Sequence, residues 1–200
     1  MHPSTDTTKC QQVWYADDST AAGKIKEIKK WWDILFSTGP KYGYFPKPSK
    51  TLLIVKNREF YDEAVSTFES TEIEVTLTGE RHLGAVLGSQ EYRDEYVEEK
   101  VRSWVKDVEQ LASIAKEEPQ YAYTSFTKAI CMRWSFLQRT IPNTKDYFIP
   151  LEETIRERLI PSIIGRRVND IERTLISLPV RFGGLGIQDP TVTADIEFRN

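Results

Sequence analysis

Residues 11–23 read QQVWYADDSTAAG, and this stretch decides the architecture expected of the first part of the chain. Residues 11–15 are β-prone, Asp17 and Asp18 follow them directly, and the next residues are small. A β-forming run, a tight return and a second short run predict a strand–turn–strand unit. The two carboxylates are then expected at the exposed end of a buried strand.

The adjacent carboxylates have two interpretations. Like charges side by side repel, so such a pair is favoured where a divalent cation neutralises it. Mg²⁺ commonly takes one or two protein carboxylates and completes its shell with water and substrate phosphates, and Mn²⁺ accepts similar oxygen ligands. The alternative is a plain Asp-Asp turn, because aspartate side chains form local hydrogen bonds in turns.

Hydrophobic periodicity outlines the remaining elements. It predicts strands at 51–55, 72–78 and 83–87, the last two forming a hairpin that turns at residues 79–80. It predicts helices at 24–36, 59–69, 91–118, 120–139, 147–164 and 170–177, with Asn169 as an N-cap of the last. The glycine-rich residues 178–189 are expected to form a packed loop. The predicted fold class is therefore α+β, with an α+β portion at 1–89 and an all-helical portion at 90–200.

Composition excludes several classes of protein. The chain has 200 residues, 40% of them hydrophobic and 12% aromatic, which excludes an intrinsically disordered chain. Two cysteines make no disulfide framework, so we expect an intracellular protein of the nucleus or cytoplasm, not a secreted one. The polar first residues do not resemble a signal peptide, and no apolar run is long enough to span a bilayer, so no membrane partner is expected.

The net charge of −3 conceals an uneven distribution. Residues 24–58 contain nine basic and two acidic residues, whereas residues 59–118 contain six basic and sixteen acidic ones. The basic stretch fits contact with phosphates. Its alternative interpretation is a solvated helix face followed by a polar loop.

Three motifs in order resemble the reverse transcriptases of retrotransposons. QVWYADD (12–18) is similar to the metal-binding hairpin of the polymerase palm, GPKYGYFPKPSKT (39–51) to the next palm motif, and RHLGAVLG (81–88) to the hairpin that grips the primer. A helical region ending in LPVRFGGLGI (178–187) follows, as in many retroelement polymerases. The resemblance implies the C-terminal part of a palm, with antiparallel strands and helices, at 1–89 and a thumb-like helical bundle at 90–200. It also implies RNA-directed DNA synthesis with an RNA template, a DNA primer and deoxynucleotides.

The resemblance assigns roles to particular residues. Asp17 would ligate the catalytic Mg²⁺ with Asp18 as a second, weaker ligand, and Lys50 would protonate the leaving pyrophosphate. Lys50 as an ordinary surface lysine and His82 as a half-exposed strand histidine are the competing interpretations. Trp31, Trp32, Trp104 and Trp134 are expected to serve in packing. The residues expected to contact nucleic acid are Tyr15, Ala16, Lys24, Lys26, Lys29, Lys30, Lys47, His82, Leu83 and Gly84.

The chain lacks one expected feature of a complete polymerase. In this family a further aspartate comes from an earlier palm strand, whereas the only acid before Tyr15 is Asp6, in a polar segment. The expected function is therefore a polymerase fragment. The alternative is a non-catalytic nucleic-acid-binding or protein-interaction module that recruits a partner chain or a missing palm half. A third interpretation is an unrelated α+β domain with chance motif matches.

We expect the 200-residue chain alone to synthesise no DNA, because two-metal catalysis needs more carboxylates than Asp17 and Asp18 supply. Primer extension on an RNA template with Mg²⁺ measures this directly, with a complete reverse transcriptase as the positive control. Robust nucleotide incorporation by the chain would contradict the expectation.

Overall fold

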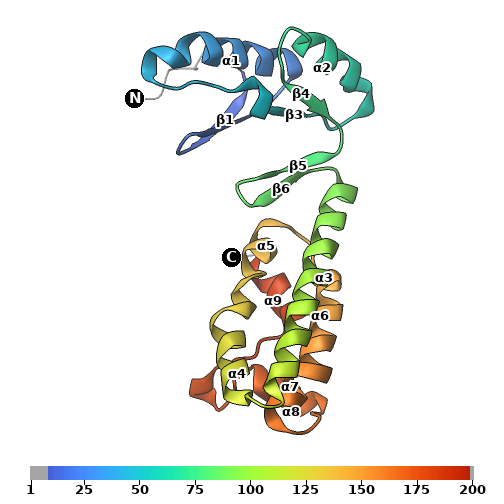
Figure 1. Ribbon diagram of the computed structural model, residues 1–200. Helices are drawn as coiled ribbons and strands as arrows, with labels where there is room; N and C mark the ends of the chain where they lie inside the picture. The colour runs from blue at the N-terminus through green and yellow to red at the C-terminus, as the bar shows by residue number, and fades with distance from the viewer. Residues whose placement is uncertain (1–8, 199–200) are drawn as a thin grey trace. The chain divides into compact units, whose positions relative to one another are not determined.

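The computed structural model describes residues 9–198 and divides the chain into two compact units (Figure 1). One unit comprises residues up to Glu80 together with Leu87–Ser89, and the other comprises Arg81–Val86 and the residues from Gln90 onward. The first unit mixes helices with short strands, and the second is mostly helical. The chain is thus of the mixed α+β class that the sequence predicts. Asp6 lies outside the described residues.

The first unit begins with the expected hairpin. Strand β1 (Gln11–Tyr15) pairs antiparallel with β2 (Asp18–Ala22), and Tyr15 lies opposite Asp18 at the turn. Helix α1 (Ile25–Thr38) follows, and its apolar face buries Trp31, Trp32 and Leu35. These side chains join a core that also includes Leu53, Val55, Ala64, Phe68 and Ile73.

The predicted pairing of residues 72–78 with 83–87 is wrong. Strand β4 (Glu74–Thr76) instead pairs in parallel with β3 (Leu52–Ile54), and helix α2 (Tyr61–Phe68) makes the crossover between them. A parallel pair requires a connection of about a dozen residues or more, which this helix and its flanking loops supply. The hairpin exists, but its strands are β5 (Gly79–His82) and β6 (Ala85–Gly88).

The second unit is built around α3 (Gln90–Ala115), whose buried stripe follows the predicted spacing. Trp104 on this helix lies 5.9 Å from Trp134 and 6.1 Å from Phe148, measured between ring centroids. Both tryptophans are buried, as expected of packing residues. Among the described residues, no helix is long and apolar enough to cross a membrane.

The helix predicted at 120–139 is interrupted. It consists of α4 (Pro119–Lys128), a 3₁₀ turn at Ile130–Met132 and α5 (Ser135–Thr140). Near the break, the Thr127 hydroxyl donates to the Tyr123 carbonyl and the Cys131 thiol donates to the Thr127 carbonyl. Side chains that bond backward to carbonyls in this way bend helices without the glycine or proline that would mark a break in the sequence.

The helix predicted at 147–164 begins as a 3₁₀ turn at Lys145–Phe148 and continues as α6 (Ile149–Thr154), a π-helical segment at Ile155–Leu159 and α7 (Ile160–Ile164). Pro161 explains the π-helical segment, because a proline lacks the N–H and its ring clashes with the carbonyl four residues earlier. The side chains of Ile155, Leu159 and Ile160 are fully buried in the core of the second unit.

A buried ion pair joins residues 170–187 to helix α6. Helix α8 (Asp170–Ser177) has the predicted Asn169 cap, completed by Glu172 as a capping box, and α9 (Pro190–Glu197) follows the glycine-rich loop. Arg173 donates to both carboxylate oxygens of Glu152 at 2.6 and 2.7 Å, and to the Ile187 carbonyl at 2.8 Å. Burial raises the pKa of the Glu152 carboxyl despite these bonds, so desolvation outweighs the attraction of the guanidinium.

We predict that Arg173→Met lowers the free energy of unfolding by about 3–5 kcal/mol, because it leaves the Glu152 carboxylate buried without a partner. Urea denaturation followed by circular dichroism measures the loss. The double variant Glu152→Leu/Arg173→Met should recover most of it, since it buries no uncompensated charge. The control is Arg139→Gln, which removes an exposed ion pair with Glu197 and should cost less than about 1 kcal/mol. Equal losses for both single variants would contradict the prediction.

Candidate functional site

Asp17 and Asp18 lie at the tip of the β1–β2 hairpin, as the sequence predicts. Tyr15 pairs with Asp18, so Ala16 and Asp17 form a two-residue turn. All four residues are exposed. Ala16 has φ +53°, in the left-handed region that favours glycine. The turn therefore presents both carboxylates to solvent and keeps a strained, small residue between Tyr15 and the acids.

One face of the hairpin is held against α1 and the loop after it. The side-chain carbonyl of Gln12 accepts hydrogen bonds from the indole N–H groups of Trp14 at 3.2 Å and Trp31 at 3.0 Å. The Trp14 ring packs edge-on against Tyr44, with 5.4 Å between centroids, and the Tyr44 and Ser19 hydroxyls lie 2.9 Å apart. These contacts orient the carboxylate turn relative to the rest of the first unit.

The opposite face of the hairpin is open. Val13 and Tyr15 are 68% and 67% exposed, although a valine and a tyrosine on a strand normally bury much of their surface against a neighbouring layer. The two-stranded hairpin thus has one packed face and one exposed face, on which Val13 and Tyr15 are the large apolar side chains.

The two carboxylates of the turn are the residues there that could hold a divalent cation. Two exposed carboxylates are enough for Mg²⁺, which keeps several waters when it binds through one or two acids. Among the described residues no group of three or more acidic, histidine or cysteine side chains forms a metal site. Asp17 and Asp18 are the ligands that the sequence predicts, and no third side chain of these kinds joins them in that part of the chain.

The four candidate lysines of α1 and its N-cap differ in charge compensation. Lys29 pairs with Asp33 at 2.6 Å, and Lys30 pairs with Glu27 at 3.1 Å. The Lys30 ammonium also lowers the pKa of the Glu27 carboxyl. Lys24, at the N-cap position, and Lys26 are exposed and form no ion pair among the described residues. Half of the predicted phosphate-contacting lysines here are thus already neutralised.

Lys47 and Lys50 lie in the loop that follows α1. Both are exposed, and Lys50 is the last residue of a 3₁₀ turn at Pro48–Lys50. Within the described part of the chain Lys50 forms no ion pair with Asp17 or Asp18, so the structure does not bring these three candidate catalytic groups into contact.

His82, Leu83 and Gly84 form the tip of the β5–β6 hairpin and belong to the second unit. Leu83 and Gly84 have φ +49° and +81°, and two positive values are typical of a type I′ turn. His82 is half-buried, whereas Leu83 is exposed in a conformation unusual for a leucine. A Cβ on Gly84 would approach the Phe136 ring to 3.3 Å, so the tip packs closely on α5.

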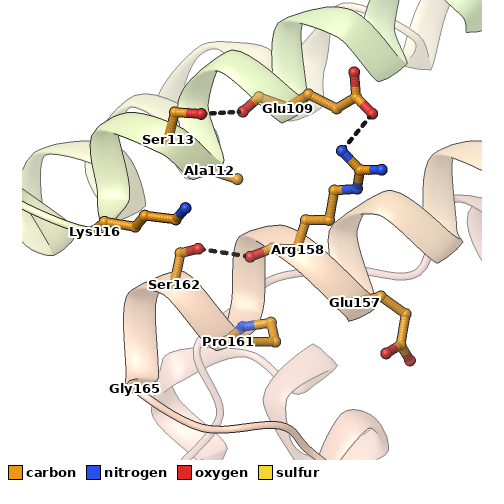
Figure 2. A pocket seen from close by; sticks show the side chains of 9 residues that line it. All are labelled: Glu109, Ala112, Ser113, Lys116, Glu157, Arg158, Pro161, Ser162 and Gly165. Carbon is orange, nitrogen blue, oxygen red and sulfur yellow. Dashed lines mark hydrogen bonds and ion pairs between the residues drawn. The ribbon is translucent and has the colours of Figure 1, made fainter.

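The second unit also has an open groove of about 530 Å³ between α3 and the helix of residues 155–164 (Figure 2). Two of its charged lining residues form an ion pair with each other, since a guanidinium nitrogen of Arg158 lies 2.9 Å from a carboxylate oxygen of Glu109. The hydroxyls of Ser113 and Ser162 donate to carbonyls of their own helices, and the Lys116 side chain extends into the space. The groove contains no nucleophile paired with a base among its lining residues.

The anchoring residues of the turn were not predicted. Gln12, Ser19 and Tyr44 carry no motif of their own, and their role arises only when the hairpin packs on α1. The one sequence signal is the alternation within β1, which places Gln12 and Trp14 on the same face.

We predict that Ala16→Gly stabilises the chain by about 0.5–1 kcal/mol. Glycine removes the free-energy cost of the left-handed conformation, and this gain exceeds the loss from the added conformational entropy of the unfolded chain. The matched control is Ala22→Gly, at an exposed strand position of the same hairpin, which should destabilise by about 0.5–1 kcal/mol. Urea denaturation compares the two. A loss of stability in both variants would show that the positive φ at position 16 carries no cost.

Comparison with known proteins gives no match. No protein-family model, no curated protein and no solved structure matches this chain.

Proposed function

We propose that this chain is the C-terminal palm and thumb-like part of a retroelement RNA-directed DNA polymerase. In the intact protein it would take part in Mg²⁺-dependent nucleotidyl transfer. The observation that carries the proposal is the turn at residues 15–18, where Asp17 and Asp18 stand exposed at the tip of a hairpin anchored from one side only. A partial palm at 1–89 and a thumb-like bundle at 90–200 belong to the same proposal.

In this proposal Asp17 is the main metal ligand and Asp18 the weaker one. The bound Mg²⁺ would neutralise phosphate charge and lower the pKa of the primer 3′-hydroxyl. The exposed Tyr15 would lie beside the primer end, and the small Ala16 would leave room for it. Lys50 would donate a proton to the departing pyrophosphate, which requires that it approach the nucleotide when substrate is bound.

The remaining candidates would hold the nucleic acid. Lys24, Lys26 and Lys47 offer ammonium groups that pair with no carboxylate in the described residues, and phosphate contact is the sequence-independent part of nucleic-acid affinity. Lys29 and Lys30 would contribute by exchanging their carboxylate partners on the same helix for phosphates, because ion pairs near the surface are weak. The tip at His82–Gly84 would contact the primer backbone.

A second candidate function is a non-catalytic binding module. The observation in its favour is the exposure of Val13 and Tyr15 on the unpacked face of the hairpin. An isolated two-stranded hairpin is marginally stable in water, so such a face favours addition of another strand or chain. In that case nucleic-acid binding would depend on the lysines, and Asp17→Asn would change it little.

We predict that Mn²⁺, used as a paramagnetic substitute for Mg²⁺, selectively broadens the backbone amide NMR signals of residues 15–19, with a dissociation constant far above micromolar. Two solvent-exposed carboxylates bind a hydrated cation weakly, and no third acid joins them in the described chain. The double variant Asp17→Asn/Asp18→Asn should abolish the broadening.

The matched control is the adjacent, exposed pair Asp62 and Glu63 on α2. Equal broadening around both pairs would mean that any two neighbouring carboxylates suffice, and the proposed metal role of the turn would lose its support. Sub-micromolar affinity would contradict the two-ligand site.

A further inference from the structure

We propose that the loop after α1 binds single-stranded nucleic acid, with bases stacking on Tyr42 and Phe45 and phosphates contacting Lys41, Lys47 and Lys50. We call these five residues the 41–50 surface. The inference rests on the proposed function, because it names the part of the chain that would hold an unpaired strand.

The two rings are the first observation. Tyr42 is 60% exposed and Phe45 is 68% exposed. Neither ring has a ring or hydrogen-bond partner in the described part of the chain, whereas Tyr44 between them packs on Trp14 and Ser19. The loop thus fixes one aromatic residue inward and directs two outward. Exposed aromatic rings beside polar groups are typical of surfaces that bind another molecule.

The backbone that carries the rings is well ordered by its own hydrogen bonds. A 3₁₀ turn at Gly39–Tyr42 is closed by the bond from the Gly43 N–H to the Pro40 carbonyl at 3.2 Å, and the Tyr44 N–H donates to the Gly39 carbonyl at 3.0 Å. Gly43 has φ +80°, and a Cβ on Gly39 would lie 2.7 Å from the Tyr44 carbonyl oxygen.

The second half of the loop is constrained in the same way. The Thr51 hydroxyl donates to the Lys47 carbonyl at 2.9 Å, and the Thr51 N–H donates to the Pro48 carbonyl at 2.9 Å. Three prolines, at 40, 46 and 48, further limit the backbone. A loop ordered before binding loses little conformational entropy when a ligand arrives, which favours affinity.

The positive charge of the loop indicates which class of ligand it binds. Between Asp33 and Glu59 the sequence has five basic residues and no acidic one. Lys41, Lys47 and Lys50 form no ion pair among the described residues, in contrast to Lys29 and Lys30 on α1. The uncompensated positive charge of this segment is thus concentrated in the loop that carries the exposed rings. A polyanion with flat, stackable groups is complementary to both features.

The rings distinguish a single strand from a duplex. In a double helix the bases are stacked on one another and their faces are covered, so a surface ring stacks only on bases that are unpaired. Stacking needs a π face and no particular base, so the 41–50 surface is expected to bind with little sequence preference. Through Tyr44 the loop also contacts the hairpin that carries Asp17 and Asp18.

The test is fluorescence anisotropy of the chain with labelled dT₁₂ and rU₁₂ at several salt concentrations. Tyr42→Ala and Phe45→Ala should each weaken binding by about 5- to 150-fold, the loss expected for one stacked base. Tyr42→Phe and Phe45→Trp retain a ring and should retain the affinity. Replacing Lys41, Lys47 and Lys50 by Gln should make the salt dependence of binding less steep.

The matched control is Tyr121→Ala on α4. Tyr121 is 64% exposed, like the rings of the loop, but it follows Glu117 and Glu118, so its loss should leave binding unchanged. Circular dichroism of each variant checks that the fold is intact.

Three results would overturn the inference. Binding of an RNA–DNA hybrid that is unaffected by Tyr42→Ala and Phe45→Ala, with no binding of single strands, would reject the 41–50 surface and leave the proposed function standing. Failure to bind any nucleic acid would count against both. Sedimentation showing that the two rings hold a dimer together would assign the surface to a second copy of the chain.

Discussion

The side-chain carbonyl of Gln12 holds the carboxylate turn in place. It accepts both the Trp14 indole of its own strand and the Trp31 indole of α1, and so it joins the hairpin to the core of the first unit. A two-stranded hairpin has little stability of its own, so its geometry depends on what it packs against. These groups are partly buried, so loss of the amide would remove a hydrogen-bond acceptor that two indole N–H groups share. The orientation of Asp17 and Asp18 therefore depends on these two hydrogen bonds together with the contacts of Trp14 and Ser19 with Tyr44.

Both described two-residue turns place a non-glycine residue at positive φ. Ala16 precedes the carboxylates, and Leu83 is exposed at the tip of the β5–β6 hairpin. Glycine would occupy either position at lower conformational cost. Each turn therefore carries a conformational cost at an exposed position, and such strain is a reason to test both tips for contact with a ligand.

Local patterns predicted local structure well. The hairpin at residues 11–22, the long helix α3 and the Asn169 cap each depend on neighbouring residues, and each was found. The partner of β4 was missed, because alternation within a strand gives its buried face but neither its neighbour nor its direction. The interruption after Lys128 was missed because no glycine or proline marks it. Helix α9 was missed because its polar pattern is weak, although Asp189 before Pro190 is a recognisable start.

In the candidate site, too, features that depend on neighbouring residues could be predicted, and features that depend on packing could not. The position of Asp17 and Asp18 at a turn could be predicted, and so could the neutralisation of Lys29 and Lys30, because their partners stand four and three residues away. The anchoring of the turn by Gln12 and Tyr44 could not, since it depends on which faces meet after packing.

These pairings change the interpretation of the basic segment. Basic residues occur both in α1 with its N-cap and in the loop that follows, but α1 neutralises part of this charge within one helix, whereas the loop lysines form no ion pair in the described structure. An anion attracted to this segment therefore meets uncompensated charge in the loop as well as at Lys24 and Lys26 at the start of α1. Tyr44 fixes that loop on the hairpin, so phosphates held there and a cation held at the turn would be bound by one packed assembly of the first unit. Two carboxylates that are costly side by side become compatible with an anionic ligand once a cation and lysines supply the opposing charge.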